Sequence, residues 1–518
     1  MRTNFLLASV GFAVVFSGVG PIAVKGETYY VDQLAGNDRN SGTHADRAWK
    51  NCPGMSAYSG TELLHPGDTV YFKRDETWPV SGPQGIYLTG GVTYVGNSWG
   101  EGSDRARIRA TADLDAGVVR FRDHLTYETV FEGFEIDGNG KVTTGVDINH
   151  SYWSLMNGAT KRLEDCEVHH TWSRQAFGQY KYGIIVSNFG GVSGYAENVE
   201  IINCAVHDTS RDGICLYPGD ENENCRIKNI TVRSCEVYNT GQDPDYGAGA
   251  GIIVKGYVQN AVIEYNYVHD TKGATMFVNG NERRHYGVGP TNVHICYNIF
   301  TGSTAHGAIR IYDGRSGQDP KDLKIYGNLV YNNTVGGGFY IGSDLGNTLS
   351  LLVYNNTFYN APVVISDNSA KVMVFEFKNN IVYYTGGVAL TDSKGQITSH
   401  SNNIFYGSSK ALVRSNGIDY NLIDIMSGYE PTASNSNPLF TNPANLPTGF
   451  TGTYGKDKAP DSDGLSLQKG SPGINSGTVL SSDFGGSINS LCRPVGSAWD
   501  IGAYQHDRRT NPFDYSRD

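Results

Sequence analysis

Two cations stand where they could carry out acid–base chemistry on an acidic sugar. Lys255 ends the run "GIIVK" and Arg310 lies within "AIRIY", each at a position that alternates with apolar residues. If the apolar residues point inward, both cations point outward, two repeats apart and roughly 10 Å from each other at the backbone. β-Elimination needs a base that removes the proton next to a uronate carboxylate and a cation that holds the carboxylate. We therefore predict Lys255 as the base and Arg310 as the carboxylate-binding cation.

Aromatic, polar and cationic residues surround this pair in the predicted arrangement. The residues that we expect to contact the substrate are Tyr217, Asn279, Arg283, Arg284, Tyr312 and Tyr340. Tyrosine rings can stack on sugar rings, although tyrosine is equally typical of an ordinary strand surface. His306 precedes the Arg310 strand and is predicted to shuttle protons.

Hydrolysis is the rival chemistry, because it requires two carboxylates about 5 to 9.5 Å apart. Acids that leave the same predicted sheet edge are Asp212, Asp245, Glu282 and Asp313, with Asp212 and Glu282 as the leading catalytic candidates. Each is also compatible with ordinary turn chemistry, since Asp is common in turns.

The metal requirement stays open. His169, His207 and His269 recur at one corner with Tyr238 and Tyr331 in their place elsewhere, which favours a structural stack over a metal site. Hard oxygen ligands for Ca²⁺ are available on loops, at Asp220, Glu221, Glu223, Asp243 and Asp245. We assign no cofactor and no metal ligand, and we leave Ca²⁺ open.

An imperfect repeat must position these residues. Cys166, Cys204 and Cys235 lie in the matching phrases "EDCEVHH", "INCAVHD" and "RSCEVYN". The same place is later taken by asparagines, namely Asn266, Asn298, Asn328, Asn356, Asn380 and Asn403. Successive members of this series of cysteines and asparagines are 38, 31, 31, 32, 30, 28, 24 and 23 residues apart. The longer repeats have room for loops, which are where a rigid scaffold usually carries function.

Each repeat contains short runs rich in Val, Ile and Tyr that are bounded by Gly, Asn, Asp and Ser. Such runs are typical of strands and turns. A unit of about 23 residues cannot close a core alone, so we predict that the units stack into a parallel β-solenoid. The recurring asparagines would then form a hydrogen-bonded ladder, and the cysteines would be buried fillers.

Three further phrases carry a resemblance to a known superfamily. They are the opening "TYYVDQLAGNDRNSGT" with "HPGDTVYFKRDETW", the closing "NPLFTNP" with "LSLQKGSPGINSG", and "RPVGSAWDIGAYQ". With the repeats, the chain resembles the secreted right-handed parallel β-helix proteins of the polysaccharide lyase and glycoside hydrolase type. The resemblance implies an all-β, right-handed parallel β-helix with N- and C-terminal capping segments. The Lys255 and Arg310 pair is similar to that of β-helix lyases of the chondroitinase and alginate lyase type.

We predict four segments along the chain. Residues 1–26 have the character of a signal peptide, because Arg2 precedes an apolar run that is too short to span a bilayer. Residues 27–125 form an N-terminal segment with the first coils, residues 126–430 the regular helix, and residues 431–518 a closing segment. The protein is therefore expected to be secreted, without a membrane span.

Composition and charge exclude several classes of protein. Glycine contributes 65 of 518 residues and apolar residues 39%, which excludes a disordered chain. Loss of Arg2 and Lys25 with the signal peptide leaves 39 basic against 52 acidic residues, a net charge of −13, which argues against nucleic acid as a partner. We expect a monomeric enzyme that cleaves a uronate-containing polysaccharide by β-elimination. The alternatives are a glycoside hydrolase and a non-catalytic glycan-binding surface protein.

Overall fold

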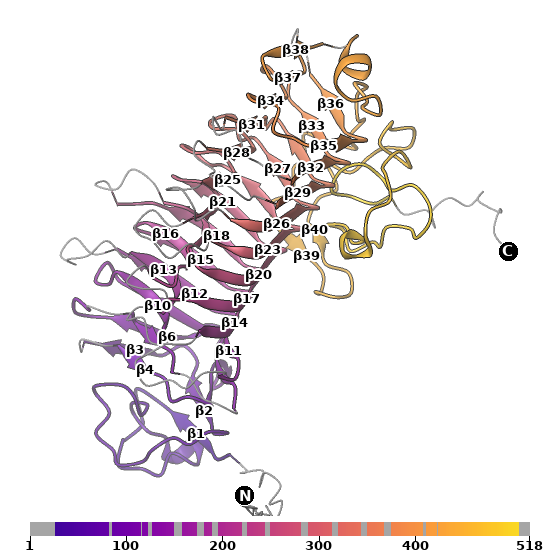
Figure 1. Cartoon of the computed structure of the whole chain (residues 1–518). Coiled ribbons are helices and arrows are strands. Elements are labelled where there is room, and N and C mark those ends of the chain that lie inside the picture. The colour runs from indigo at the N-terminus through magenta and orange to yellow at the C-terminus, as the bar shows by residue number, and fades with distance from the viewer. Residues whose placement is uncertain are drawn as a thin grey trace, which may run out of the picture.

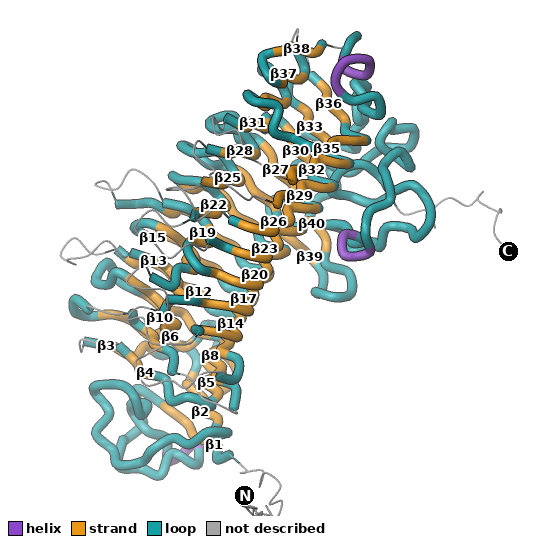
Figure 2. Tube along the Cα trace, viewed as in Figure 1, coloured by secondary structure: helices purple, strands orange, loops and turns teal. Residues whose placement is uncertain are grey.

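Three long parallel sheets run the length of the molecule (Figures 1 and 2). The structure is a computed structural model that describes residues 26–81, 85–114, 117–122, 127–149, 158–172, 181–188, 195–219, 225–243, 249–280, 289–312, 320–342, 350–366, 374–407, 411–421 and 423–506. Helix is confined there to three short segments: the 3₁₀ turns η1 (Ala45–Arg47) and η3 (Ser482–Phe484) and the π-helical turn η2 (Ile425–Tyr429). None of these helices is long and apolar enough to cross a membrane.

The strands of each sheet come from successive turns of the chain. Sheet A contains β1 (Thr28–Val31), β2 (Thr69–Lys73), β5 (Thr93–Trp99), β8 (Thr129–Glu132), β11 (Lys161–Glu164), β14 (Ala196–Ile202), β17 (Ile227–Arg233), β20 (Val258–Glu264), β23 (Thr291–Cys296), β26 (Lys321–Tyr326), β29 (Ser350–Tyr354), β32 (Val374–Lys378) and β35 (Ser399–Ser401). Sheet B contains β4 (Ile86–Tyr87), β7 (Val119–Arg120), β10 (Thr144–Asn149), β13 (Tyr182–Ser187), β16 (Asp212–Leu216), β19 (Ile252–Lys255), β22 (Met276–Asn279), β25 (Ile309–Tyr312), β28 (Phe339–Ile341), β31 (Val363–Ile365), β34 (Leu390–Asp392), β37 (Val413–Ser415) and β38 (Ile418–Tyr420). Sheet C contains β3 (Thr77–Val80), β6 (Ala106–Ala110), β9 (Phe134–Asp137), β12 (Glu167–Thr171), β15 (Ala205–Thr209), β18 (Glu236–Thr240), β21 (Tyr267–Thr271), β24 (Ile299–Thr301), β27 (Leu329–Tyr331), β30 (Thr357–Tyr359), β33 (Ile381–Tyr383) and β36 (Ile404–Tyr406).

Pairing confirms the predicted solenoid. Each strand pairs with the strand that lies one turn before and one turn after it, so each turn of the chain contributes one strand to each sheet. Among the described residues, antiparallel strand pairs are limited to β37 with β38 and to β39 (Phe450–Thr451) with β40 (Ala459–Pro460), apart from isolated bridges. The chain is a right-handed parallel β-helix, the hand that twisted strands impose on parallel crossovers.

Apolar side chains fill the interior of the helix from end to end. Inward positions such as Phe134, Val168, Ile214 and Ile309 belong to one continuous buried cluster that extends from Tyr29 to Ala433. Because a single turn has too few apolar residues for a core of its own, stacking is what removes these side chains from water.

The asparagine ladder forms as predicted. The amide of Asn328 donates to Asn356 Oδ1 (2.9 Å) and to the carbonyl of Ile295 (2.8 Å), and its own Oδ1 accepts from Asn298. The same bonds repeat along the column as far as Asn403, where the buried carboxylate of Glu430 accepts the last pair of N–H groups. Cys166, Cys204 and Cys235 continue the column, are fully buried and form no disulfide, as expected of fillers.

The residue before each cysteine or asparagine of this column has a left-handed backbone conformation. Asn203, Tyr265, Asn355 and Asn402 have φ values between 52° and 55°, and Gly327 has 66°. This conformation turns the chain sharply from sheet A into sheet C, and Asn and Gly tolerate it best. In each repeated Asn pair, the first residue therefore forms the turn between sheets A and C, and the second belongs to the hydrogen-bonded ladder.

The closing segment lies along the flank of the stack instead of only covering its end. Phe440, Leu465, Ile488 and Ile501 pack against outward apolar residues of sheet C in β24, β27, β33 and β36. Figure 1 shows this segment, in yellow, beside the C-terminal half of the helix. The buried guanidinium of Arg493 ties the segment together by donating to the carbonyls of Asp500 (2.8 Å) and Gly502 (2.7 Å). Sheet C has apolar side chains on both faces here, so a covering segment is required.

Candidate active site

The outer face of sheet B has the alternation that the sequence predicts. Ile252 and Val254 point into the core, whereas Ile253 and Lys255 face outward. The register aligns Ile253, Phe277, Arg310 and Tyr340 in one outward row. Lys255, Asn279 and Tyr312 form the neighbouring row. Lys255 and Arg310 thus share one face, two turns apart and one row offset, on β19 and β25.

Lys255 rests on an aromatic ring. Its Nζ lies 5.0 Å from the ring centre of Tyr217, which follows β16 in the preceding turn. No carboxylate of the described residues lies within 4.0 Å of this ammonium group. A cation held by a ring instead of by an acid remains available for an anionic partner.

Arg310 lies among three aromatic rings. Its guanidinium carbon is 5.3 Å from the ring centre of Phe277, 5.2 Å from Tyr312 and 5.7 Å from Tyr340. The Tyr340 hydroxyl accepts a hydrogen bond from Ser366 (3.1 Å), which holds this ring in place. Rings on several sides restrict the guanidinium to a narrow range of directions, as a carboxylate-binding group requires.

Asp212 is a buried acid close to this face. Burial raises the pKa of its carboxyl group, and Arg211, the backbone N–H of Ala250 and Lys255 offset only part of that effect. Arg211 Nε lies 3.3 Å and Ala250 N 2.8 Å from the Asp212 carboxylate. A carboxyl group with a raised pKa can act as a proton donor near neutral pH.

His306 lies three residues before β25, the strand that carries Arg310. Burial first, and then the positive charge of Arg310, lower the pKa of its imidazole. The neutral form is therefore favoured at pH 7, and a neutral imidazole can accept a proton.

Much of this outer face is buried although it points away from the core. Tyr182, Ile185, Cys215 and Ile253 form a second apolar cluster with Phe277 at its border. Tyr217 and Asn279 are 5% and 1% exposed, whereas Tyr312 and Tyr340 are partly exposed. The described structure therefore makes Tyr217 a support for Lys255, and Tyr312 and Tyr340 the rings that a ligand can reach.

Several predicted site residues lie outside the described residues. They are Glu282, Arg283 and Arg284, with the further acids Asp220, Glu221, Glu223, Asp245 and Asp313. Of the four acids considered for hydrolysis, Asp212 alone lies in the described part of the chain. Asp243, one of the loop acids considered for Ca²⁺, is 4% exposed and pairs with Lys181.

Sheet C carries a group of residues that the sequence reasoning recognised only in part. The rings of His169, His207, Tyr238 and His269 stack in a column with centroids 4.6 to 5.2 Å apart, as predicted for a structural stack. Reasoning from sequence did not single out Asp137, His170 or Glu135, which gather around His169. The signal that could have found them is "VHH", which departs from the "VHD" of two later repeats.

The molecule is thus a parallel β-helix with a cationic and aromatic outer face on sheet B. A family model described as disaggregatase related matches residues 196–306, and no curated protein matches the chain. Among solved structures, pectate lyase Pel9A is 16% identical, with a TM-score of 0.48 over 93% of this chain and 97% of that one. XylC, solved with xylose, is 9% identical, with a TM-score of 0.48 over 92% and 98%. The A-module of the mannuronan C-5 epimerase AlgE6 from Azotobacter vinelandii is 13% identical, with a TM-score of 0.43 over 71% and 91%.

Proposed function

We propose that this protein is a secreted, carbohydrate-active enzyme that cleaves a uronate-containing polysaccharide by β-elimination on the outer face of sheet B. The observation that carries the proposal is the presence of Lys255 and Arg310 on one face, with Lys255 held over Tyr217 and no carboxylate partner for it among the described residues. Lys255 lies over the ring of Tyr217, and Arg310 lies among the rings of Phe277, Tyr312 and Tyr340. A face with cations and aromatic rings suits an anionic sugar polymer.

The chemistry follows from these positions. Arg310 binds the uronate carboxylate, which draws electron density from the neighbouring carbon and stabilises the charge that grows there. Lys255, after its ammonium group has released a proton to water, takes the proton from that carbon. The electrons of the C–H bond form a carbon–carbon double bond as the glycosidic carbon–oxygen bond breaks. Neutral His306 relays a proton from solvent to the departing oxygen: one ring nitrogen accepts a proton and the other gives up its N–H proton. The products are a new chain end and an unsaturated uronate.

A panel of polyuronates and neutral glycans tests the proposal. Each reaction is followed both by ultraviolet absorbance, which reports the unsaturated uronate, and by the appearance of reducing ends. The proposal expects both signals together on at least one polyuronate and neither signal on neutral glycans. Reducing ends without absorbance would replace the lyase with a hydrolase, and glycan binding with neither signal would indicate a binding protein.

The hydrolase is the second candidate, because burial keeps the pKa of Asp212 raised, as a general acid needs. It predicts that Asp212→Asn abolishes the release of reducing ends. The lyase predicts that the same variant retains elimination, provided that circular dichroism shows it folded.

The positive charge of Arg310 also predicts a measurable shift in the pKa of His306. In the folded protein the imidazole pKa lies below the ordinary 6.5, first from burial and then from Arg310. The contribution of neutral His306 to stability is therefore complete above pH 6.5 and is lost as the pH falls through the folded-state pKa. We expect Arg310→Gln to raise that pKa towards 6.5. NMR titration of ¹³C-labelled histidine, assigned with His306→Asn, measures it, and an unchanged midpoint would show that Arg310 does not act on His306.

A further inference from the structure

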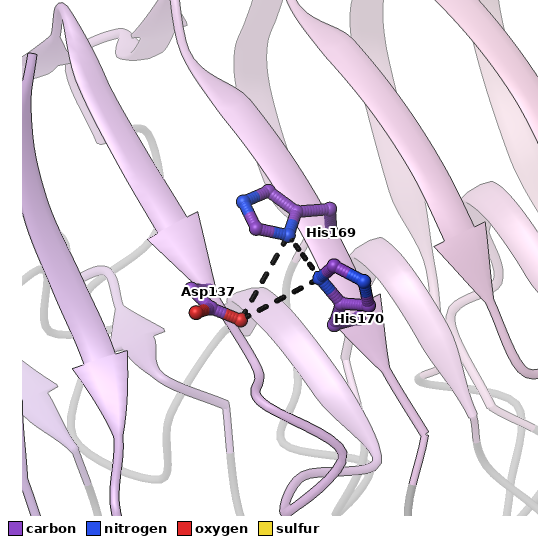
Figure 3. A group of neighbouring side chains, drawn as sticks. All are labelled: Asp137, His169 and His170. Carbon is purple, nitrogen blue, oxygen red and sulfur yellow. Dashed lines mark hydrogen bonds and ion pairs between the residues drawn. The ribbon is translucent and has the colours of Figure 1, made fainter. Parts of the chain in front are cut away.

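A compact group of metal-ligand atoms lies at the corner that follows β12, on sheet C and apart from the proposed active site. Asp137 ends β9, and His169 and His170 lie near the end of β12 in the next turn (Figure 3). The Nδ1 atoms of His169 and His170 are 2.5 Å apart. Asp137 Oδ1 lies 3.8 Å from Nδ1 of His169 and 3.7 Å from Nδ1 of His170. Two imidazoles and one carboxylate thus converge on a single point.

Equivalent turns of the same chain show what the ordinary arrangement is. His207 Nδ1 bonds to Asp208 (2.7 Å), and His269 Nδ1 bonds to Asp270 (2.8 Å). In each case the aspartate is the next residue, with a φ near 50°. His170 has the same φ of 52° but places a second imidazole where the carboxylate belongs. The acid is supplied instead by Asp137 from the preceding turn, where the register aligns it with His169.

His169 turns its Nδ1 towards the other two groups. Glu135 Oε1 lies 3.0 Å from Nε2 of His169, so that nitrogen is already engaged by a carboxylate. Nδ1 is the nitrogen that lies beside Asp137 and His170. A carboxylate behind a histidine is the usual outer support of a metal-bound imidazole. On the other side Arg109 Nε, 3.1 Å from Asp137 Oδ2, fixes the acid with Oδ1 towards the histidines.

We propose that Asp137, His169 and His170 form a binding site for a divalent transition-metal ion of the zinc class. Imidazole nitrogen with carboxylate oxygen suits zinc, cobalt or nickel, whereas Ca²⁺ prefers oxygen ligands alone. Ligands about 2.0 to 2.1 Å from a tetrahedral ion stand roughly 3.3 Å apart, so the two rings need to separate by less than about 1 Å. The side chain of His170 is 58% exposed, which leaves room for water as the fourth ligand and for entry of the ion.

Titration of tag-free, chelator-treated full-length protein tests the site. With Zn²⁺ in a calorimeter we expect one saturable equivalent at this site, and with Co²⁺ we expect the visible absorption of a four- or five-coordinate ion. His170→Asn removes the ligand but should fold, because Asn239 occupies the equivalent position with a φ of 50°. We expect His170→Asn to lose both the equivalent and the absorption band. Asp137→Asn, which keeps an acceptor for the backbone N–H of Asn139, is the second ligand variant.

Two further variants separate a metal site from a merely structural cluster. Glu135→Gln should weaken Zn²⁺ binding by about 10- to 100-fold, the usual effect of losing an outer carboxylate. His269→Tyr is the matched control, because Tyr238 already occupies an equivalent place in the column, and it should leave binding unchanged. The proposal would be overturned if the wild type showed no saturable Zn²⁺ binding, or if His170→Asn and Asp137→Asn bound Zn²⁺ as tightly as the wild type. The cluster would then be a hydrogen-bonded histidine pair.

Discussion

We expect Lys255→Met to abolish the formation of unsaturated uronate while leaving the fold intact. Loss of a positioned base costs about 10²- to 10⁴-fold in rate, and methionine retains the apolar stem that lies beside Tyr217. The initial rate of absorbance increase on the polyuronate that the wild type cleaves measures the effect. Circular dichroism and the thermal midpoint should be unchanged, because Lys255 makes no ion pair with a described residue.

Lys321→Met is the matched control for this experiment. Lys321 is partly exposed at the start of β26 on sheet A, so its replacement changes the net charge by the same amount on a different face. We expect Lys321→Met to retain full activity. Equal activity in Lys255→Met and the wild type would remove Lys255 from the mechanism, and with it the proposed elimination at this face.

We expect Asn328→Asp to destabilise the β-helix by about 3 kcal/mol or more. The side-chain amide of Asn328 donates to Ile295 and Asn356, and both acceptors lose this donor when the amide becomes a carboxylate, although Asn356 keeps the backbone N–H of Asn328. An ionised carboxylate at this fully buried position would also face Asn356 Oδ1 without solvent. The midpoint of urea unfolding, followed by circular dichroism, measures the loss, which should be largest above the pKa of an ordinary aspartate.

Asn328→Cys is the matched variant, because cysteine occupies the same column in earlier turns. The Cys235 thiol lies 3.5 Å from the carbonyl of Ile201, which is the contact that an asparagine amide makes elsewhere. This variant keeps a donor for Ile295, loses the acceptor for Asn298 and the amide donor to Asn356, and buries no charge, so we expect about half the loss of Asn328→Asp. An unchanged midpoint in Asn328→Asp would show that the ladder accompanies the fold without stabilising it.

Reasoning from sequence correctly predicted which side chains of sheet B point outward. It did not predict which of those outward side chains are buried by other parts of the chain. The positions of Lys255, Arg310 and Tyr340 follow from alternation along a strand, which is a local property. That Tyr217 and Asn279 are buried does not follow from alternation, because burial depends on what the rest of the chain places over the sheet. Whether Glu282, Arg283 and Arg284 take part in the site remains a prediction, since they lie outside the described residues.

By itself the sequence determined the β-helix. Cysteines and asparagines recur at the same place in successive repeats, and each repeat contains alternating apolar residues. Because one repeat is too small to form a core, the repeats must stack to bury these residues. The asparagine ladder follows from the same repeat. Tertiary structure alone decided the groupings that join different turns. Asp137 meets His169 through the register of β9 with β12, and the closing segment returns to cover sheet C far from its place in the chain. These contacts depend on how turns of unequal length come into register, and no single repeat contains that information.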